Sequence, residues 1–465
     1  MTPPRHGPEP SPELARLLNG LARPVLVGAA FFAAAIAASA VHGRAFFLVT
    51  TRQWIVLLLL PALAAAALPV AAARLSPARR IRVATVVGSI VVSLFAANIL
   101  VADVGPPGTA VGAAAPKGAP FDRRSVAQVV ASLRSQGKPA VPAVYPTNFI
   151  LSERGRGALS AADVGFPLAG ISNRPTVFCN ESGEYIVYHS DQYGFQNPPD
   201  AWAGRPDIAL VGDSFVHGVC VPPERNIAGV LRERGRTVLN LGMGSAGPLS
   251  ALGRIEEYAR ALAPADVFWF FYEGNDAYDL EVEAKVPTLM AYLTTERTQA
   301  ITSHQAEIDR ALLAYAEEYG SAAGPSPGLV RGAWEFLTLR RLRSALALDF
   351  PVELPVPEAP DFELYGRVLA KARDKVASWG GRMHFVYLPA HTRYRSPDKV
   401  GPFKDELLAS VRRLGVPTID VVEVFKPVPD PLNLFPFRSH GHYLEAGYQL
   451  VAEAILRALD EQRPT

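Results

Sequence analysis

Four separated segments of the chain carry residue types that suit acyl transfer. Ser214, Gly244 and Asn275 each lie just beyond a short apolar run, and His442 lies near the end of the chain. A serine hydroxyl becomes a nucleophile when a histidine accepts its proton. Backbone N–H groups and a side-chain amide stabilise the oxyanion that forms when an acyl carbon is attacked. The four segments therefore predict a serine-dependent acyl-transfer site.

The residue types also suggest a role for each position. Ser214 is predicted on a tight strand-to-helix turn, where its hydroxyl is exposed and its own backbone N–H is an oxyanion donor. The turn after the second apolar run offers the N–H of Gly244 or Ser245, and Asn275 offers its side-chain amide. The predicted catalytic residues are thus Ser214 and His442. The predicted oxyanion hole contains Ser214, Gly244, Ser245 and Asn275.

Short apolar runs that alternate with amphipathic helical patterns predict a parallel α/β sheet in the C-terminal half of the chain. The carboxyl ends of parallel strands meet at one edge of a sheet, and ligands bind there. This topology would bring the separated polar residues together. The predicted strands are Ile208–Val211, Val238–Leu241, Val267–Tyr272, His384–Leu388 and Pro417–Ile419.

The same segments resemble the SGNH (GDSL-type) hydrolase family, whose name lists Ser, Gly, Asn and His in this order. Gly-Asp-Ser ending at Ser214 is similar to the first block, and Gly-Asn-Asp centred on Asn275 is similar to the third. The second block is looser, because Ser245 stands where the family has its glycine, with Gly244 just before it. The resemblance covers about Asp207 to Leu459. It implies a flavodoxin-like three-layer α/β sandwich with a parallel sheet of about five strands.

The fourth block departs from the family pattern. The family carries an aspartate two or three residues before the histidine, where this chain has His440 and Ser439. We therefore expect a Ser-His dyad, because a triad histidine keeps some activity without its acid. Carboxylates that could replace the aspartate from elsewhere in the chain are Asp430, Asp420 and Glu445.

Three apolar runs near the N-terminus are long enough to cross a bilayer: Pro24 to Val41, Trp54 to Ala73 and Val83 to Ala102. Their length of about 18 to 20 residues matches a hydrocarbon core of roughly 30 Å. None of them contains a charged side chain. The sequence therefore predicts three transmembrane helices, with the lipid bilayer as a partner.

Arginine positions predict the orientation of these spans, because cytoplasmic loops are enriched in basic residues. Arginines precede the first span and fill the connection between the second and third, although the first loop also holds Arg44 and Arg52. An Ala-x-Ala pattern at residues 38–40 leaves open a cleaved leader. The composition, rich in Ala, Arg and Pro and poor in Lys, suggests a GC-rich bacterial genome. We expect a multi-pass protein of the bacterial inner membrane with a periplasmic catalytic domain.

The two cysteines, Cys179 and Cys220, both lie in the predicted external body. An oxidising compartment permits disulfides. We predict that they are bonded, and the alternative is two buried thiols.

Composition changes along the chain suggest its domains. The predicted parts are a membrane anchor (1–104), a Gly/Ala/Pro-rich spacer (105–140), a small β-rich entry segment (141–206) and a hydrolase domain (207–461) with a helical insertion at about 280–361.

The formal charge of +2 offers no basic field for nucleic acid, and we expect no nucleic-acid partner. No metal-ligand spacing or phosphate-binding glycine loop occurs in the sequence, so no metal and no cofactor are expected.

Three functions stay open. The first is an esterase acting on O-acyl groups of saccharides, with O-acetyl groups among its candidates. The second is an O-acyltransferase that modifies an envelope or exported polysaccharide and receives its acyl group from a separate membrane protein. The third is a degenerate glycan-binding or assembly protein.

Overall fold

The computed structural model describes residues 11–43, 54–101, 121–122, 124–151, 166–296, 298–319, 329–346, 348, 360–397, 403–439 and 441–461. The chain divides into two compact units. One contains the N-terminal helices together with residues 326–352, and the other contains the remaining residues. The predicted basic residues Arg44 and Arg52, and most of the predicted spacer, lie outside the described residues.

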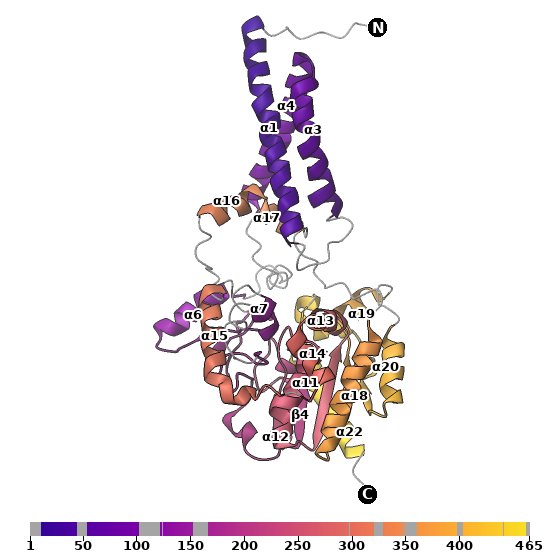
Figure 1. The fold of residues 1–465 in the computed structure, drawn as a ribbon. Helices are drawn as coiled ribbons and strands as arrows, with labels where there is room; N and C mark the ends of the chain where they lie inside the picture. Colours follow the sequence, from indigo (N-terminus) through magenta and orange to yellow (C-terminus); the bar gives the residue numbers. More distant parts are fainter. Residues whose placement is uncertain are drawn as a thin grey trace. The chain divides into compact units, whose positions relative to one another are not determined.

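The N-terminal unit consists of helices, as its apolar runs predict. Helix α1 (Pro12–Gly43) lies against both α3 (Leu60–Arg74) and α4 (Pro77–Leu100), with the π-helical turn η1 (Trp54–Leu59) before α3 (Figure 1). Three helices in the described residues are long and apolar enough to cross a membrane. Because an unpaired backbone N–H or C=O is costly in lipid, a continuous helix is the form such runs require. The predicted three helices are confirmed.

The N-terminal unit also includes two helices from the predicted insertion, α16 (Leu329–Leu337) and α17 (Arg340–Ala345). The backbone N–H of Leu342 donates to Asn98 Oδ1 at 3.0 Å, and the guanidinium of Arg343 donates to Ser39 Oγ at 2.6 Å. The Phe336 ring stacks on Phe95. These contacts join the insertion to the C-terminal ends of α1 and α4.

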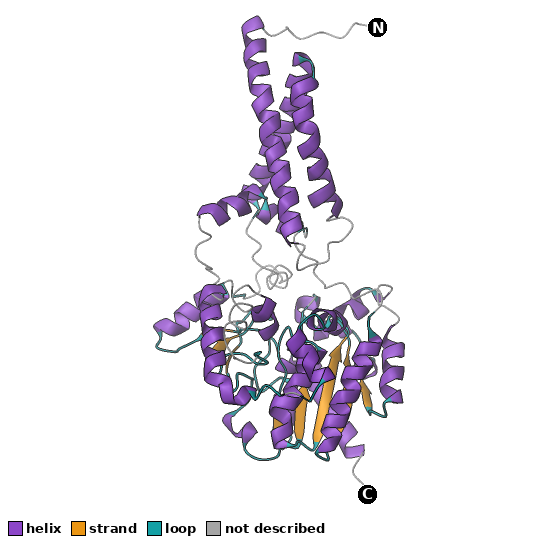
Figure 2. Cartoon of the chain, viewed as in Figure 1, coloured by secondary structure: helices purple, strands orange, loops and turns teal. Residues whose placement is uncertain are grey.

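The second unit is built on a parallel sheet of five strands in the order β5-β4-β6-β7-β8. Figure 2 shows strands of this sheet among the helices that pack around it. In chain order the sheet is 2-1-3-4-5, the flavodoxin-like arrangement. The predicted fold class is therefore confirmed. The strands are β4 (Ile208–Val211), β5 (Val238–Asn240), β6 (Asp266–Tyr272), β7 (Arg382–Leu388) and β8 (Thr418–Asp420).

Alternate residues of these strands face two separate apolar cores. Val267, Trp269 and Phe271 of β6 belong to one core, and Phe268 and Phe270 belong to the other. Strands buried on both faces read as continuous apolar runs, which is why the sequence predicted them. The first core is covered by α11 (Pro248–Arg254), α14 (Pro287–Thr294), α15 (Gln305–Tyr319), α18 (Phe362–Ser378) and α20 (Phe403–Arg413). The second is covered by α9 (Ser214–His217), α10 (Ile227–Glu233), α21 (Val421–Phe425) and α22 (Glu445–Glu461).

The segment before this sheet forms a second, three-stranded sheet in the order β1-β2-β3. Asn197 connects the segment to the large sheet, because its side chain both accepts from the backbone N–H of Asn240 and donates to the backbone O of Asn240. Its elements are α6 (Val126–Ser135), β1 (Val141–Pro142), α7 (Pro146–Leu151), β2 (Pro175–Val177), β3 (Val187–His189) and η3 (Pro199–Trp202).

Short elements complete the second unit. They are η4 (Ile255–Ala259), α12 (Arg260–Leu262), α13 (Asp276–Glu283), η5 (Ile301–His304), α19 (His391–Arg395), η7 (Pro431–Leu434) and η8 (Pro436–Arg438).

Candidate active site

The serine lies where strand β4 turns into helix α9. Asp213 caps this helix, because its carboxylate accepts the backbone N–H of Phe215 at 3.0 Å. Gly218, with φ of 83°, ends the helix after one turn, and a side chain there would collide with Asn226. Ser214 is therefore the first helical residue at the carboxyl end of a buried strand, as the motif predicts.

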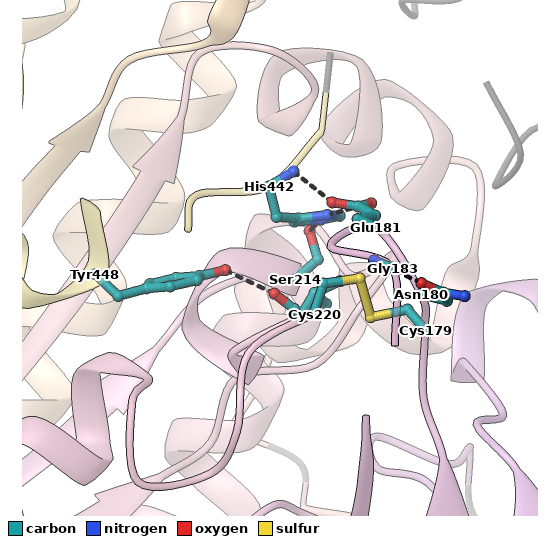
Figure 3. Close-up of a disulfide and its surroundings, with 9 residues drawn as sticks. Cys179, Asn180, Glu181, Gly183, Ser214, Cys220, His442 and Tyr448 are labelled. Atoms are coloured by element: carbon teal, nitrogen blue, oxygen red, sulfur yellow. Dashed lines mark hydrogen bonds and ion pairs between the residues drawn. A yellow bond between two sulfur atoms is a disulfide. The ribbon is translucent and has the colours of Figure 1, made fainter. Parts of the chain in front are cut away.

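Three side chains form a continuous hydrogen-bonded chain (Figure 3). Ser214 Oγ lies 2.8 Å from His442 Nε2, and His442 Nδ1 lies 2.9 Å from Glu181 Oε1. The backbone N–H of His442 donates to Glu181 Oε2 at 2.8 Å. With Nδ1 donating to the carboxylate, Nε2 is left as the acceptor for the serine proton. The arrangement is that of a nucleophile, its base and the acid that orients the base.

Glu181 was not predicted, and the structure differs here from the expected Ser-His dyad. The carboxylates considered as replacements have other partners: Asp430 binds Arg438, Asp420 binds Lys404, and Glu445 lies 3.9 Å from Arg225. The acid comes instead from the loop between β2 and β3, which precedes the serine in the chain.

A sequence signal for Glu181 did exist. It stands two residues after Cys179, and the predicted bond to Cys220 would have brought this loop close to the Ser214 helix.

A glycine allows the carboxylate to approach the histidine backbone. A Cβ atom at Gly441 would lie 2.9 Å from Glu181 Oε2, closer than side chains normally pack. Any larger residue at this position would push the carboxylate away from His442. The neighbouring His440, which stands at a position considered for the family's aspartate, lies outside the described residues.

The surroundings of His442 favour its charged form. Burial opposes the charge, but the negative charge and hydrogen bond of Glu181, together with the charge of Asp213, outweigh it and raise the pKa of His442 above its ordinary value of 6.5. The imidazole is therefore a stronger base than a free histidine. Asp213 also lies within 3.3 Å of Ser214 Oγ, and burial raises the pKa of its carboxyl.

The second block contacts the serine helix through His217. The backbone N–H of Gly244 donates to His217 Nδ1 at 3.2 Å, and His217 Nε2 lies 3.0 Å from Tyr188 Oη. Burial, assisted by the positive charges of Arg254 and His442, lowers the pKa of His217 to about 3, so this imidazole is neutral and is not the base.

The predicted role of Gly244 as an oxyanion donor is therefore corrected, because its backbone N–H already donates to His217 Nδ1. Ser245, which adopts the left-handed conformation with φ of 54°, is the remaining backbone donor of this turn.

Asn275 lies at the start of α13, just beyond the carboxyl end of β6, the strand next to β4. Among the described residues, its buried Oδ1 has no hydrogen-bond partner. The flanking acidic residues hold this loop: Asp276 accepts the backbone N–H of Tyr272, and Glu273 accepts the backbone N–H of Ala390. The structure thus brings the first and third blocks to adjacent strand ends.

Two other histidines, one in β7 and one at the start of α19, have partners within the fold. His384 is buried, stacks on Phe268 and lies 2.8 Å from Asp266 Oδ1. His391 Nε2 lies 3.2 Å from the backbone O of Arg438. Within the described residues, no group of three His, Cys, Asp or Glu side chains could hold a metal ion.

Cys179 and Cys220 form a disulfide, as predicted, with their Cα atoms 5.4 Å apart. Figure 3 shows the bond next to Glu181, Ser214 and His442. Cys220 lies three residues beyond the end of the serine helix, and the backbone O of the preceding Val219 accepts from Tyr448 Oη at 3.2 Å.

No family model matches the chain, and no curated protein matches it. A solved structure described as a lipolytic protein of the G-D-S-L family from Desulfitobacterium hafniense DCB-2 is similar at 14% identity and a TM-score of 0.32, over 54% of this chain and 97% of that one. An acetyl xylan esterase, AlAXEase, is similar at 11% identity and a TM-score of 0.30, over 54% of this chain and 98% of that one. At these values the assignment of the fold rests on the strand order of this chain itself.

Proposed function

We propose that the protein is a membrane-anchored serine esterase of the SGNH type. The observation that carries the proposal is the chain of hydrogen bonds from Ser214 through His442 to Glu181. A hydroxyl, a base and an orienting carboxylate in this geometry are the parts that acyl transfer needs. A Ser-His-Glu triad replaces the dyad that the sequence suggested.

In the first step, Ser214 Oγ attacks the acyl carbon of an ester while its proton passes to His442 Nε2. Glu181 holds the opposite ring nitrogen and stabilises the imidazolium that forms. The negative charge on the acyl oxygen is met by the backbone N–H of Ser214 and Ser245 and by the side-chain amide of Asn275. When the tetrahedral intermediate collapses, the bond to the alcohol breaks and His442 returns the proton to the leaving oxygen.

In the second step, water attacks the acyl-serine. His442 takes a proton from this water, the bond to Ser214 Oγ breaks, and the proton moves to the serine oxygen. The acid leaves and the enzyme is restored. Because the base must begin both steps uncharged, activity should rise with pH through the raised pKa of His442.

The substrate class and the location of the protein rest on other observations. The resemblance to SGNH hydrolases supports O-acyl groups, including O-acetyl groups, on saccharides. Three apolar helices and the arginine distribution support an inner-membrane protein with a periplasmic catalytic domain. The position of the disulfide in the catalytic unit agrees with an oxidising compartment.

The same acyl-enzyme could pass its acyl group to a sugar hydroxyl, with a membrane acyl-donor protein as partner. Hydrolysis and transfer differ only in which hydroxyl attacks the acyl-serine. A degenerate binding protein would have no reason to keep a carboxylate hydrogen-bonded to both the backbone N–H and the ring Nδ1 of His442.

The test uses the full chain in detergent with p-nitrophenyl acetate and with an O-acetylated oligosaccharide. We expect acetate release that depends on Ser214. Acceptor oligosaccharide added to the assay would divert acetate to the sugar if the protein is a transferase. A folded full-length protein that cleaves neither ester and forms no covalent adduct at Ser214 would overturn the proposal.

A further inference from the structure

The acid and the nucleophile lie on segments that are joined covalently. Glu181 lies in the loop between β2 and β3, and Cys179 of this loop is bonded to Cys220, six residues after Ser214. The bond closes a separation of 41 residues. It therefore connects the loop whose Glu181 binds His442 to the segment that contains Ser214.

The loop has an ordered turn of its own. The backbone N–H of Ile186 donates to the backbone O of Cys179 at 2.9 Å, which continues the strand pairing up to the cysteine. Beyond it, Asn180 Oδ1 accepts the N–H of Gly183, and Asn180 Nδ2 donates to the backbone O of Asp122 at 2.7 Å. Glu181 thus lies in a tight turn, two residues after the bonded cysteine.

The base of the hairpin is held by packing in addition to the covalent bond. Phe178 and Tyr188 form a buried cluster with Val219 and Cys220, and the Phe178 ring lies 4.4 Å from the His217 ring. These contacts do not include Glu181. Loss of the disulfide should leave the hairpin folded on the serine segment while releasing its tip.

We propose, resting on the function proposed above, that the Cys179–Cys220 disulfide is a positioning element that holds the Glu181 carboxylate against His442. The two cysteines act through Glu181 and do not touch the substrate. A disulfide that served only for stability could bridge any two parts of the unit. This one joins the turn that bears the acid to a residue three positions beyond the serine helix, so reduction should uncouple the acid from the base.

The test is a double-mutant cycle on the full chain with p-nitrophenyl acetate. The variants are Cys179→Ser with Cys220→Ser, Glu181→Gln, and the three changes combined. We expect the cysteine changes to lower kcat by up to about 10²-fold at unchanged KM, the scale on which misplacement of a catalytic group acts. In the Glu181→Gln background they should cause little further loss, because the group that they position has already been removed.

The pH profile separates positioning from simple stabilisation. With the carboxylate no longer held at the ring, the midpoint of kcat/KM against pH should move to lower pH, toward that of Glu181→Gln. Reduction of the wild-type protein should reproduce both effects, and it should leave the cysteine double variant unchanged. The proposal would be overturned if the cysteine changes and Glu181→Gln lowered kcat by independent factors. It would also be overturned by a cysteine double variant with a lower melting temperature but the kcat and pH midpoint of the wild type.

A measurement without turnover separates failure of this inference from failure of the proposed function. The imidazole of His442 can be titrated by NMR in histidine-labelled protein, with its signal assigned by His442→Gln. We expect a lower pKa in the cysteine double variant than in the wild type, whether or not an ester is cleaved. Equal pKa values in the two proteins would overturn the positioning role, and inactivity of the wild type would count only against the esterase.

Discussion

The proposed triad draws on two regions of the molecule that differ in how they place a side chain. Ser214 follows directly from strand β4, which is buried on both faces between paired neighbours. Glu181 comes from a loop of a small three-stranded sheet and depends on a turn, a disulfide and its own bonds to His442. The nucleophile is thus positioned by the core of the fold, and the acid by an accessory hairpin. Changes to the core region should abolish activity, whereas changes to the hairpin should reduce it in steps.

The largest effect is expected from the nucleophile, which the core of the fold positions. Ser214→Ala removes the nucleophile and should lower kcat for ester cleavage by about 10⁶-fold, as in serine proteases. The buried surroundings of α9 do not change, so the melting temperature should stay near that of the wild type. Initial rates with p-nitrophenyl acetate measure this, with Ser135→Ala at an exposed position of α6 as the control. Substantial remaining activity would show that another residue is the nucleophile.

The hairpin should give the next largest effect. Glu181→Gln keeps the size of the side chain, but it leaves one acceptor for two donors of His442 and removes the negative charge. By analogy with the aspartate of serine proteases, kcat should fall by about 10³- to 10⁴-fold.

The same variant should shift the pH dependence. In the wild type, kcat/KM should rise with pH and reach its midpoint above 6.5, because the folded protein raises the pKa of His442. Without the charge of Glu181, burial opposes the imidazolium and the midpoint should move to lower pH. The matched control is Glu184→Gln, an exposed carboxylate of the same loop. If both variants behave like the wild type, Glu181 is not part of the site.

The next prediction concerns Asn275, which lies beyond the end of β6 in the core region. Asn275→Ala removes a predicted oxyanion donor and should lower kcat by about 10²- to 10³-fold with little change in KM. Asn275→Asp keeps the shape but presents oxygens to the developing negative charge, so its loss should be greater still. Steady-state kinetics distinguish the two variants. Equal kcat for Asn275→Ala and the wild type would remove this residue from the site.

The smallest effect on activity is expected from the segment that carries the hairpin. Buried Asp191 accepts hydrogen bonds from the backbone N–H of Tyr193 and Phe195 and from the side chains of Asn197 and Trp202. Asp191→Ala leaves these donors without an acceptor and should lower the free energy of unfolding by about 1–3 kcal/mol. Because β2, β3 and the disulfide remain, kcat below the melting temperature should change little. Chemical denaturation and kinetics on the same sample measure both quantities.

The parts of the fold that were predictable are those that follow from local patterns. Continuous apolar runs such as Val267–Tyr272 give strands buried on both faces, and the three N-terminal runs give long helices. The placement of α16 and α17 with the N-terminal helices was not predictable in this way. It depends on contacts such as Leu342 with Asn98 and Arg343 with Ser39, which join residues far apart in the sequence.

The site divides in the same manner. Ser214 and Asn275 follow strands directly, so the order of strands brings them together, and His442 precedes the last helix. Glu181 follows no strand of the large sheet, and no spacing relates it to His442. Gly244 was wrongly predicted as an oxyanion donor, because its N–H donates to the His217 ring, and this contact depends on the orientation of that ring. Side-chain partners of this kind need coordinates.

Mass spectrometry of the full-length protein treated with a fluorophosphonate tests the central claim most directly. The account predicts one adduct, located on Ser214, that forms more slowly in Glu181→Gln and is absent in His442→Gln. A folded protein that forms no adduct, or that is labelled at the same rate after His442 is replaced, would contradict it.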